Sequence, residues 1–192
     1  MLPIVAYGHS TLRKISQDID RDYPELDKLI HDMFETMYES VGVGLAAPQI
    51  NRSIRLFIID ATPYADDIPE AKDFKKVFIN ARIIEQSGSE WVTDEGCLSI
   101  PNIREDVSRK EMIRIQYYDQ NWEFHDETHG GYIARIIQHE YDHLEGILFT
   151  DRINPLRKTL IRRRLNDISR GNVKVDYKMI FPAQKKKLTR SY

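Results

Sequence analysis

The sequence predicts an α+β fold in which antiparallel β-sheets pack around a central helix, with one helix nearer the N-terminus and another nearer the C-terminus. Apolar residues recur at helical spacing in two separate stretches, cap and stop residues mark a third helix, and short runs rich in β-branched and aromatic residues lie between the helices. A polar turn at residues 119–121 separates two such runs, as in a hairpin. The alternation of these patterns, without repeats or low-complexity tracts, indicates a mixed globular fold.

The first predicted helix follows an irregular N-terminal arm at residues 3–19. After Pro24 an apolar stripe covers residues 26–38 at a spacing of three and four. Proline is favoured in the first turn of a helix and glycine just after its end. We therefore expect this helix to begin near Pro24 and to end at Gly42.

Most of the predicted strands lie between the first helix and the centre of the chain. Residues 54–60 are β-rich and predict a buried strand, whereas the polar residues 62–76, with two prolines, predict a surface loop without evident catalytic consequence. A second strand is expected over residues 77–86, ending at the Ser-Gly pair that follows. A third, over residues 109–119, leads through the turn into the Trp-Glu-Phe run of residues 122–124.

Two more helices are predicted from their ends. Gly131 opens an apolar stripe that Gly146 closes. The Asn-Pro pair at residues 154–155 is typical of a helix cap and first turn, and predicts a last helix that ends near Arg170. Residues 173–181 are expected to add one strand, and the remainder to be loose.

Length and composition predict one domain over residues 1–192, in which residues 172–192, after the last predicted helix, form a strand and a basic tail. Cys97 is the single cysteine, so no internal disulfide can form and a reducing compartment is expected. The sequence shows neither a signal-peptide pattern nor a long apolar run, which predicts a soluble, cytoplasmic protein.

The charge of the chain is balanced overall but uneven along its length. The net charge is −2, which argues against broad binding to nucleic acid or membrane. From Arg157 onward, however, basic residues dominate, with clusters at residues 162–164 and 185–187. Such a region is usually a solvated face, and the alternative is a polyanionic partner such as RNA.

The chemical centre of the sequence is His-Glu-Tyr-Asp-His at residues 139–143, within the second predicted helix. His139 and His143 are four residues apart, so a helix places both imidazoles on one face, with Glu140 at its edge. This H-E-x-x-H pattern is typical of two metal ligands and a general base. The alternative is a helix that carries two histidines by chance.

Cys97 could complete such a site. An isolated cysteine is usually an inert core residue, and a nucleophilic thiol paired with a histidine is a second possibility. Here the cysteine lies on a strand-like segment, in a chain whose two helical histidines need a third partner. One thiolate and two imidazoles leave the fourth position of a tetrahedral metal open for water, which is the arrangement of a catalytic site.

Three stretches together resemble the signature motifs of the peptide deformylase family, in that family's order and spacing. They are Gly-Val-Gly-Leu-Ala-Ala-Pro-Gln at residues 42–49, Glu-Gly-Cys-Leu-Ser at residues 95–99, and the pattern at residues 139–143. The similarity extends from the N-terminus to about residue 165. It implies a hydrolase that removes the formyl group from the N-terminal formyl-methionine of new bacterial polypeptides.

The resemblance also implies the roles of individual residues. Cys97, His139 and His143 would hold the metal, a metal-bound water would be the nucleophile, and Glu140 would serve as general acid and base. Gln49 and the Leu98 N–H would donate to the oxyanion. From residues 42–49 alone, the simpler interpretation of Gln49 is a polar side chain whose hydrogen bonds are satisfied within the fold. Its role as an oxyanion donor therefore rests on the resemblance.

Substrate contacts carry over in the same way. The matching positions are Val43, Gly44, Gly96, Tyr132 and Ile136 for the backbone and methionine side chain, and Arg104 for the bound peptide. Arg104 is otherwise a solvated surface charge. Arg109 and Asp142 match an ion pair behind the metal-binding helix.

The resemblance predicts one divalent metal per chain, ferrous iron in the cell, with zinc, nickel or cobalt possible in purified protein. It also suggests that the basic last helix docks on the ribosome. Two other functions are compatible with the pattern at residues 139–143. An H-E-x-x-H metalloprotease would usually take its third ligand downstream, and a structural metal site in an RNA- or ribosome-binding module would need a fourth protein ligand.

Overall fold

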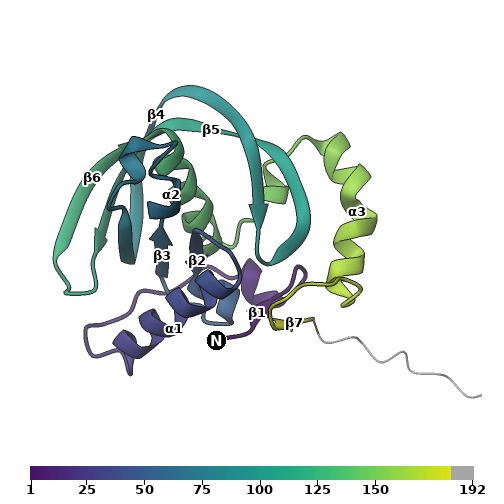
Figure 1. Ribbon diagram of the computed structural model, residues 1–192, viewed down its shortest axis with the longest axis horizontal. Coiled ribbons are helices and arrows are strands. Elements are labelled where there is room, and N and C mark those ends of the chain that lie inside the picture. Colours follow the sequence, from purple (N-terminus) through teal and green to yellow (C-terminus); the bar gives the residue numbers. More distant parts are fainter. Residues whose placement is uncertain (183–192) are drawn as a thin grey trace, which may run out of the picture.

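A five-stranded antiparallel sheet forms the centre of the protein, and three helices pack around it (Figure 1). The computed structural model describes residues 1–182. The order in the sheet is β2-β3-β4-β5-β6, and a separate parallel pair joins β1 to β7. The helices are α1 (Leu26–Glu39), α2 (Gly131–Leu144) and α3 (Pro155–Ser169). The strands are β1 (Ile4–Val5), β2 (Gly44–Ala46), β3 (Leu56–Asp60), β4 (Lys75–Cys97), β5 (Ile100–Tyr118), β6 (Phe124–Gly130) and β7 (Met179–Ile180). This arrangement confirms the predicted α+β class.

Helices α1 and α2 cover opposite faces of the sheet. Alternate residues of β3 point to opposite sides, so Phe57 and Ile59 pack in one core with α2, while Leu56 and Ile58 pack in another with α1. Every residue of β3 is therefore buried, which explains its continuous apolar run. A third core lies between β5 and α3, and it includes residues of the N-terminal arm.

The hairpin of β4 and β5 is much longer than the sequence predicted. We expected the first of these strands to end at Ser87 and Gly88, yet β4 continues to Cys97. The pairing register shifts between Ser87 and Glu90, and Gly88 adopts a φ of 79° there, so the strand passes the glycine through an irregularity instead of stopping. Figure 1 shows the two strands as a long arch over α2. Cys97 is the last residue of β4.

The ends of the other elements differ from the prediction in detail. Pro24 precedes α1, whose cap residue is Glu25, and the left-handed residue after its end is Val41 and not Gly42. Helix α3 begins as expected, because the Asn154 side chain accepts a hydrogen bond from the Leu156 N–H at 2.8 Å. The strand expected over residues 173–181 is reduced to β7, since only that part pairs with another strand.

Two remaining predictions concern the basic C-terminal cluster and membrane-spanning helices. The basic cluster at residues 185–187 lies outside the described residues. Within residues 1–182, none of the helices has both the length and the apolar character needed to cross a bilayer.

Candidate metal centre and active-site cleft

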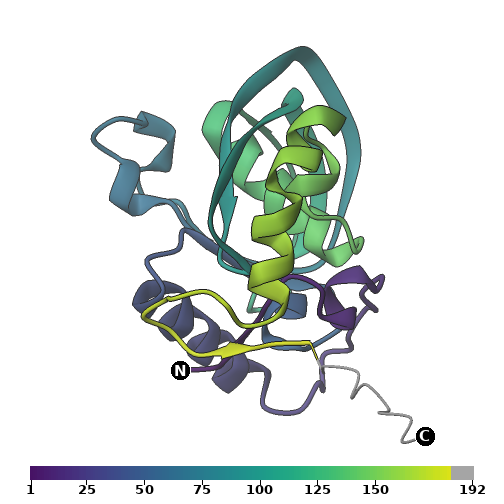
Figure 2. The same cartoon turned by 90° about the vertical axis from the view of Figure 1, so that its right-hand side faces the viewer.

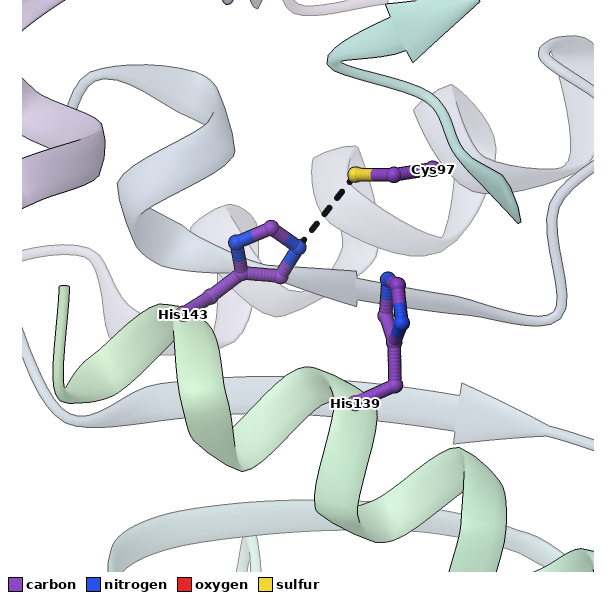
Figure 3. Close-up of side chains that lie close together, drawn as sticks. All are labelled: Cys97, His139 and His143. Carbon is purple, nitrogen blue, oxygen red and sulfur yellow. Dashed lines mark hydrogen bonds between the residues drawn. The ribbon is translucent and has the colours of Figure 1, made fainter. Parts of the chain in front are cut away.

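Cys97, His139 and His143 converge at one point between β4 and α2 (Figure 3). Both histidines project from the same face of α2, and the cysteine reaches them from the end of β4. One ligand atom from each residue lies within 4.8 Å of the others, and the Cys97 Sγ is 3.4 Å from the His143 Nε2. His143 is buried, whereas Cys97 and His139 are partly exposed. A thiolate and two imidazoles at this separation fit a divalent metal.

Glu95 orients one of these ligands. Its carboxylate accepts a hydrogen bond from the His139 Nδ1 at 2.9 Å, which leaves the Nε2 of that ring to face the site. Glu95 also accepts hydrogen bonds from Arg109 at 2.6 and 2.9 Å and from Arg135 at 3.0 Å. Although burial opposes ionisation, the hydrogen bonds from Arg109 and His139 hold the pKa of Glu95 well below its usual range.

The ion pair expected behind the helix is present. The Arg109 Nη1 donates to the Asp142 Oδ2 at 2.7 Å, and Arg152 donates to the same carboxylate at 2.6 Å. Arg109 thereby joins Glu95 on β4 to Asp142 on α2, and it fixes the strand that carries Cys97 against the helix that carries the histidines.

Glu140 is buried beside the three residues with an unused acceptor. Its Oε2 has no hydrogen-bond partner within residues 1–182. Burial raises the pKa of Glu140 to about 7, which suits a group that must both take up and release a proton near neutral pH. A Cβ at Gly44 would lie 2.5 Å from the Glu140 Oε1, so only glycine leaves room for this carboxyl group. The glycine-rich stretch is therefore approached closely by a side chain of the protein itself.

Gln49 is held so that its amide nitrogen faces the cysteine. The Gln49 Oε1 accepts a hydrogen bond from the Ala46 N–H at 2.8 Å, and the Nε2 lies 3.5 Å from both the Cys97 Sγ and the Ser99 Oγ. The side chain is buried. The donor end of the amide is therefore directed toward the region between the glycine-rich stretch and Cys97.

A cleft of about 1050 Å³ opens beside these residues, which is large enough for a short peptide. Every residue predicted to act in catalysis, substrate binding or metal binding lines this cleft except His143. The predicted residues that line the cleft are Val43, Gly44, Gln49, Gly96, Cys97, Leu98, Arg104, Tyr132, Ile136, His139 and Glu140. Arg104 lies on its exposed rim, where its guanidinium group contacts Asp94.

Several residues that line the cleft or support the metal ligands were not predicted from the sequence. Glu95 carried a usable signal, because residues two apart on a strand share a face and Glu95 is two residues before Cys97. Arg135 is buried beside Trp91, 5.0 Å from the centre of its ring, and also lines the cleft. Tyr64 and Ile68 line it from residues 62–76, so the predicted surface loop borders the cleft.

Known proteins match this chain over the region that contains the three motifs. The family model described as polypeptide deformylase matches residues 1–159, a span that includes all three. A peptide deformylase from Christiangramia forsetii is 55% identical, covering 97% of this chain and 98% of the relative. One from Flavobacterium johnsoniae is 50% identical, with coverage of 97% and 98%. A crystal structure of peptide deformylase from Plasmodium falciparum matches with 39% identity and a TM-score of 0.78, covering 88% of this chain and 95% of that one. A peptide deformylase structure from Legionella pneumophila matches with 36% identity and a TM-score of 0.78, covering 91% and 99%.

Proposed function

Because the chain belongs to the peptide deformylase family, we propose that its cleft binds formyl-methionyl N-termini and that Glu140, Gln49 and Leu98 carry out the hydrolysis beside a metal held by Cys97, His139 and His143. The protein is an enzyme that removes the formyl group from newly made polypeptides. The observation that carries the assignment of roles is the convergence of Cys97, His139 and His143 at one point, beside a cleft that Glu140, Gln49 and Leu98 line. A structural metal site would not explain why the buried Oε2 of Glu140 has no hydrogen-bond partner among residues 1–182.

The metal site is the first part of this proposal. A divalent ion bound to one thiolate and two imidazoles would supply Lewis-acid chemistry, by lowering the pKa of water toward neutrality and by polarising the formyl oxygen. The donor types fit iron, zinc, nickel and cobalt alike. We propose ferrous iron in the cell, and metal analysis of anaerobically purified protein tests that identity.

Proton transfer is assigned to Glu140. Its carboxyl group lines the cleft beside His139, and it can take a proton from the attacking water and later donate it to the leaving amine. Two donors face the developing oxyanion in this scheme. One is the Gln49 amide, aimed by its bond to Ala46, and the other is the Leu98 N–H, next to Cys97 in the chain.

Substrate binding is assigned to the walls of the same cleft. We place the methionine side chain against Tyr132 and Ile136 of α2, and the peptide backbone along Val43 and Gly44 and at Gly96. Arg104 on the rim would contact the residues that follow methionine. In this scheme residues 1–192 act as one catalytic domain in the bacterial cytoplasm, where its substrates are made, and the bacterial relatives support that compartment.

Formate release from formyl-Met-Ala-Ser tests the function directly. Protein purified anaerobically should release formate rapidly, should lose that activity on treatment with a chelator, and should regain it with ferrous iron. The matched acetyl-Met-Ala-Ser peptide should remain intact, since the extra methyl group must fit where the formyl hydrogen lies. Cleavage of casein without formate release would identify a metalloprotease and contradict the proposal.

We further propose that α3 contributes to ribosome docking. Arg162 and Arg163 are exposed on this helix, whereas Arg157 and Arg164 bind Glu105 and the Asn102 carbonyl. The double variant Arg162→Ala/Arg163→Ala should therefore pellet less with ribosomes, and the difference should shrink as salt is raised. Lys14→Ala/Arg52→Ala removes equal charge from other exposed positions and serves as the control. Equal pelleting of both double variants and wild type would rule out this role.

A further inference from the structure

The segment that follows α3 returns to the cleft. Residues 172–182 leave the end of α3, loop outward and run back beside the N-terminal strand, as Figure 2 shows. Strand β7 pairs with β1, and the Ile4 N–H donates to the Lys178 carbonyl at 2.9 Å. Residues 174–177 line the same cleft as Glu140 and Cys97. The segment is therefore a wall of the active site, although it lies beyond the part of the chain that the family model matches.

Tyr177 makes the closest connection between this wall and the catalytic region. Its hydroxyl donates a hydrogen bond of 2.7 Å to the Leu98 carbonyl. The two side chains pack against the same hydrophobic core, below the sheet face that α1 covers. Burial raises the pKa of Tyr177 well above its usual value, so the hydroxyl keeps its proton at any pH at which the enzyme would work.

Leu98 is held on two other sides as well. A Cβ at Gly42 would lie 2.9 Å from the Leu98 Cδ1, so the leucine side chain fits tightly against the glycine-rich stretch. The next residue, Ser99, accepts a hydrogen bond on its carbonyl from the Tyr7 N–H at 2.8 Å. The backbone carbonyl of Leu98 thus depends on the C-terminal segment, while its side chain and its neighbour are fixed from elsewhere.

We propose that Tyr177 is a positioning residue for the hydrolysis, because its hydroxyl fixes the backbone at Leu98 and so aims the Leu98 N–H at the developing oxyanion. This inference rests on the proposed function, in which Leu98 is an oxyanion donor. A donor of this kind acts only if it is placed in advance, and a small displacement weakens it steeply. The C-terminal segment would therefore contribute to turnover without touching the reacting atoms.

The test compares Tyr177→Phe with Tyr117→Phe in the iron-loaded full-length protein. Both changes remove a hydroxyl that donates a hydrogen bond, but Tyr117 bonds to Glu127 at 3.0 Å on the sheet, away from the cleft. For Tyr177→Phe we expect kcat to fall about tenfold, less than the ~10²–10³-fold cost of losing an oxyanion donor outright. KM and metal content should be unchanged, since the oxyanion exists only in the transition state. Tyr117→Phe should keep the wild-type kcat.

Hydrogen exchange gives a second readout that does not depend on activity. Backbone exchange in the peptide that contains Leu98 should be faster in Tyr177→Phe than in wild type or Tyr117→Phe. An unchanged kcat, a loss confined to KM, or a parallel loss of metal would each overturn the positioning role, and so would unchanged exchange. A wild-type protein that releases no formate would instead overturn the proposed function itself, and the exchange result would still show whether Tyr177 restrains Leu98.

Discussion

Alanine in place of Glu140 should lower kcat for formate release by about 10²–10⁴-fold, the usual contribution of a general acid–base group. Glu140 is buried at the cleft, and in the described part of the chain its Oε2 has no partner and its carboxylate makes no ion pair. Its removal therefore deletes the proton carrier and leaves the ion pairs of residues 1–182 in place. The three metal-binding side chains remain, and the metal content should therefore stay at the wild-type level. Steady-state kinetics with formyl-Met-Ala-Ser and metal analysis of the same samples provide the measurement.

Two further variants make the Glu140 result specific. Glu140→Gln keeps the shape of the side chain but cannot accept a proton, and it should lose nearly as much activity as the alanine variant. Glu111→Ala removes an exposed carboxylate from β5 and should behave as wild type. If Glu140→Gln retained full activity, the carboxyl group would not be the base. If the alanine variant lost its metal, the lower kcat would reflect metal loss instead.

Of the substitutions proposed for this protein, Glu95→Ala should cause the largest loss of stability. It should lower the free energy of unfolding by about 3–5 kcal/mol. The substitution leaves the Arg109 and Arg135 guanidinium groups buried without the carboxylate they share. It also removes the hydrogen bond that orients His139, and partners of this kind are typically worth about 10–100-fold in metal affinity. Urea unfolding and competition with a chelator measure the two effects separately.

Glu105→Ala is the matched control for this prediction. Glu105 is buried on β5, directly opposite Glu95 of β4 in the strand register. Its ion-pair partner, Arg157, is exposed. Its loss leaves no buried charge unpaired, so the free energy of unfolding should fall much less and metal affinity should not change. Equal destabilisation by the two substitutions would contradict the central role assigned to the Glu95 network.

The sequence went far in predicting the local structure. Helices α1, α2 and α3 follow from apolar periodicity and cap residues, because a helix is held by bonds between residues that are close in the chain. Strands were predicted where β3, β4 and β5 lie, but β1 and β2 were missed. Strand β4 was cut short at Gly88, since a glycine in a strand can mark either an end or an irregularity. Pairing with β5 decides between the two, and that contact is not local.

The candidate site also contains residues that local sequence spacing predicts and residues that it does not. His139, Glu140 and His143 could be identified together because one helical turn separates the ligands. The roles of Cys97, Gln49 and Leu98 came from the resemblance of three motifs to a family, and those roles stay predictions until the variants are measured. Glu95 was overlooked, although its position two residues before Cys97 offered a signal.

The sequence by itself determined the α+β class, the three helices, the family and the residue types that could bind a metal. Only the tertiary structure decided that Glu95 is shared among His139, Arg109 and Arg135, and that residues 174–177 close one wall of the cleft. Periodicity and motifs record interactions between near neighbours in the chain. The meeting of Tyr177 with Leu98 depends instead on the strand register and on the return of the chain after α3, which are set by packing of the whole molecule.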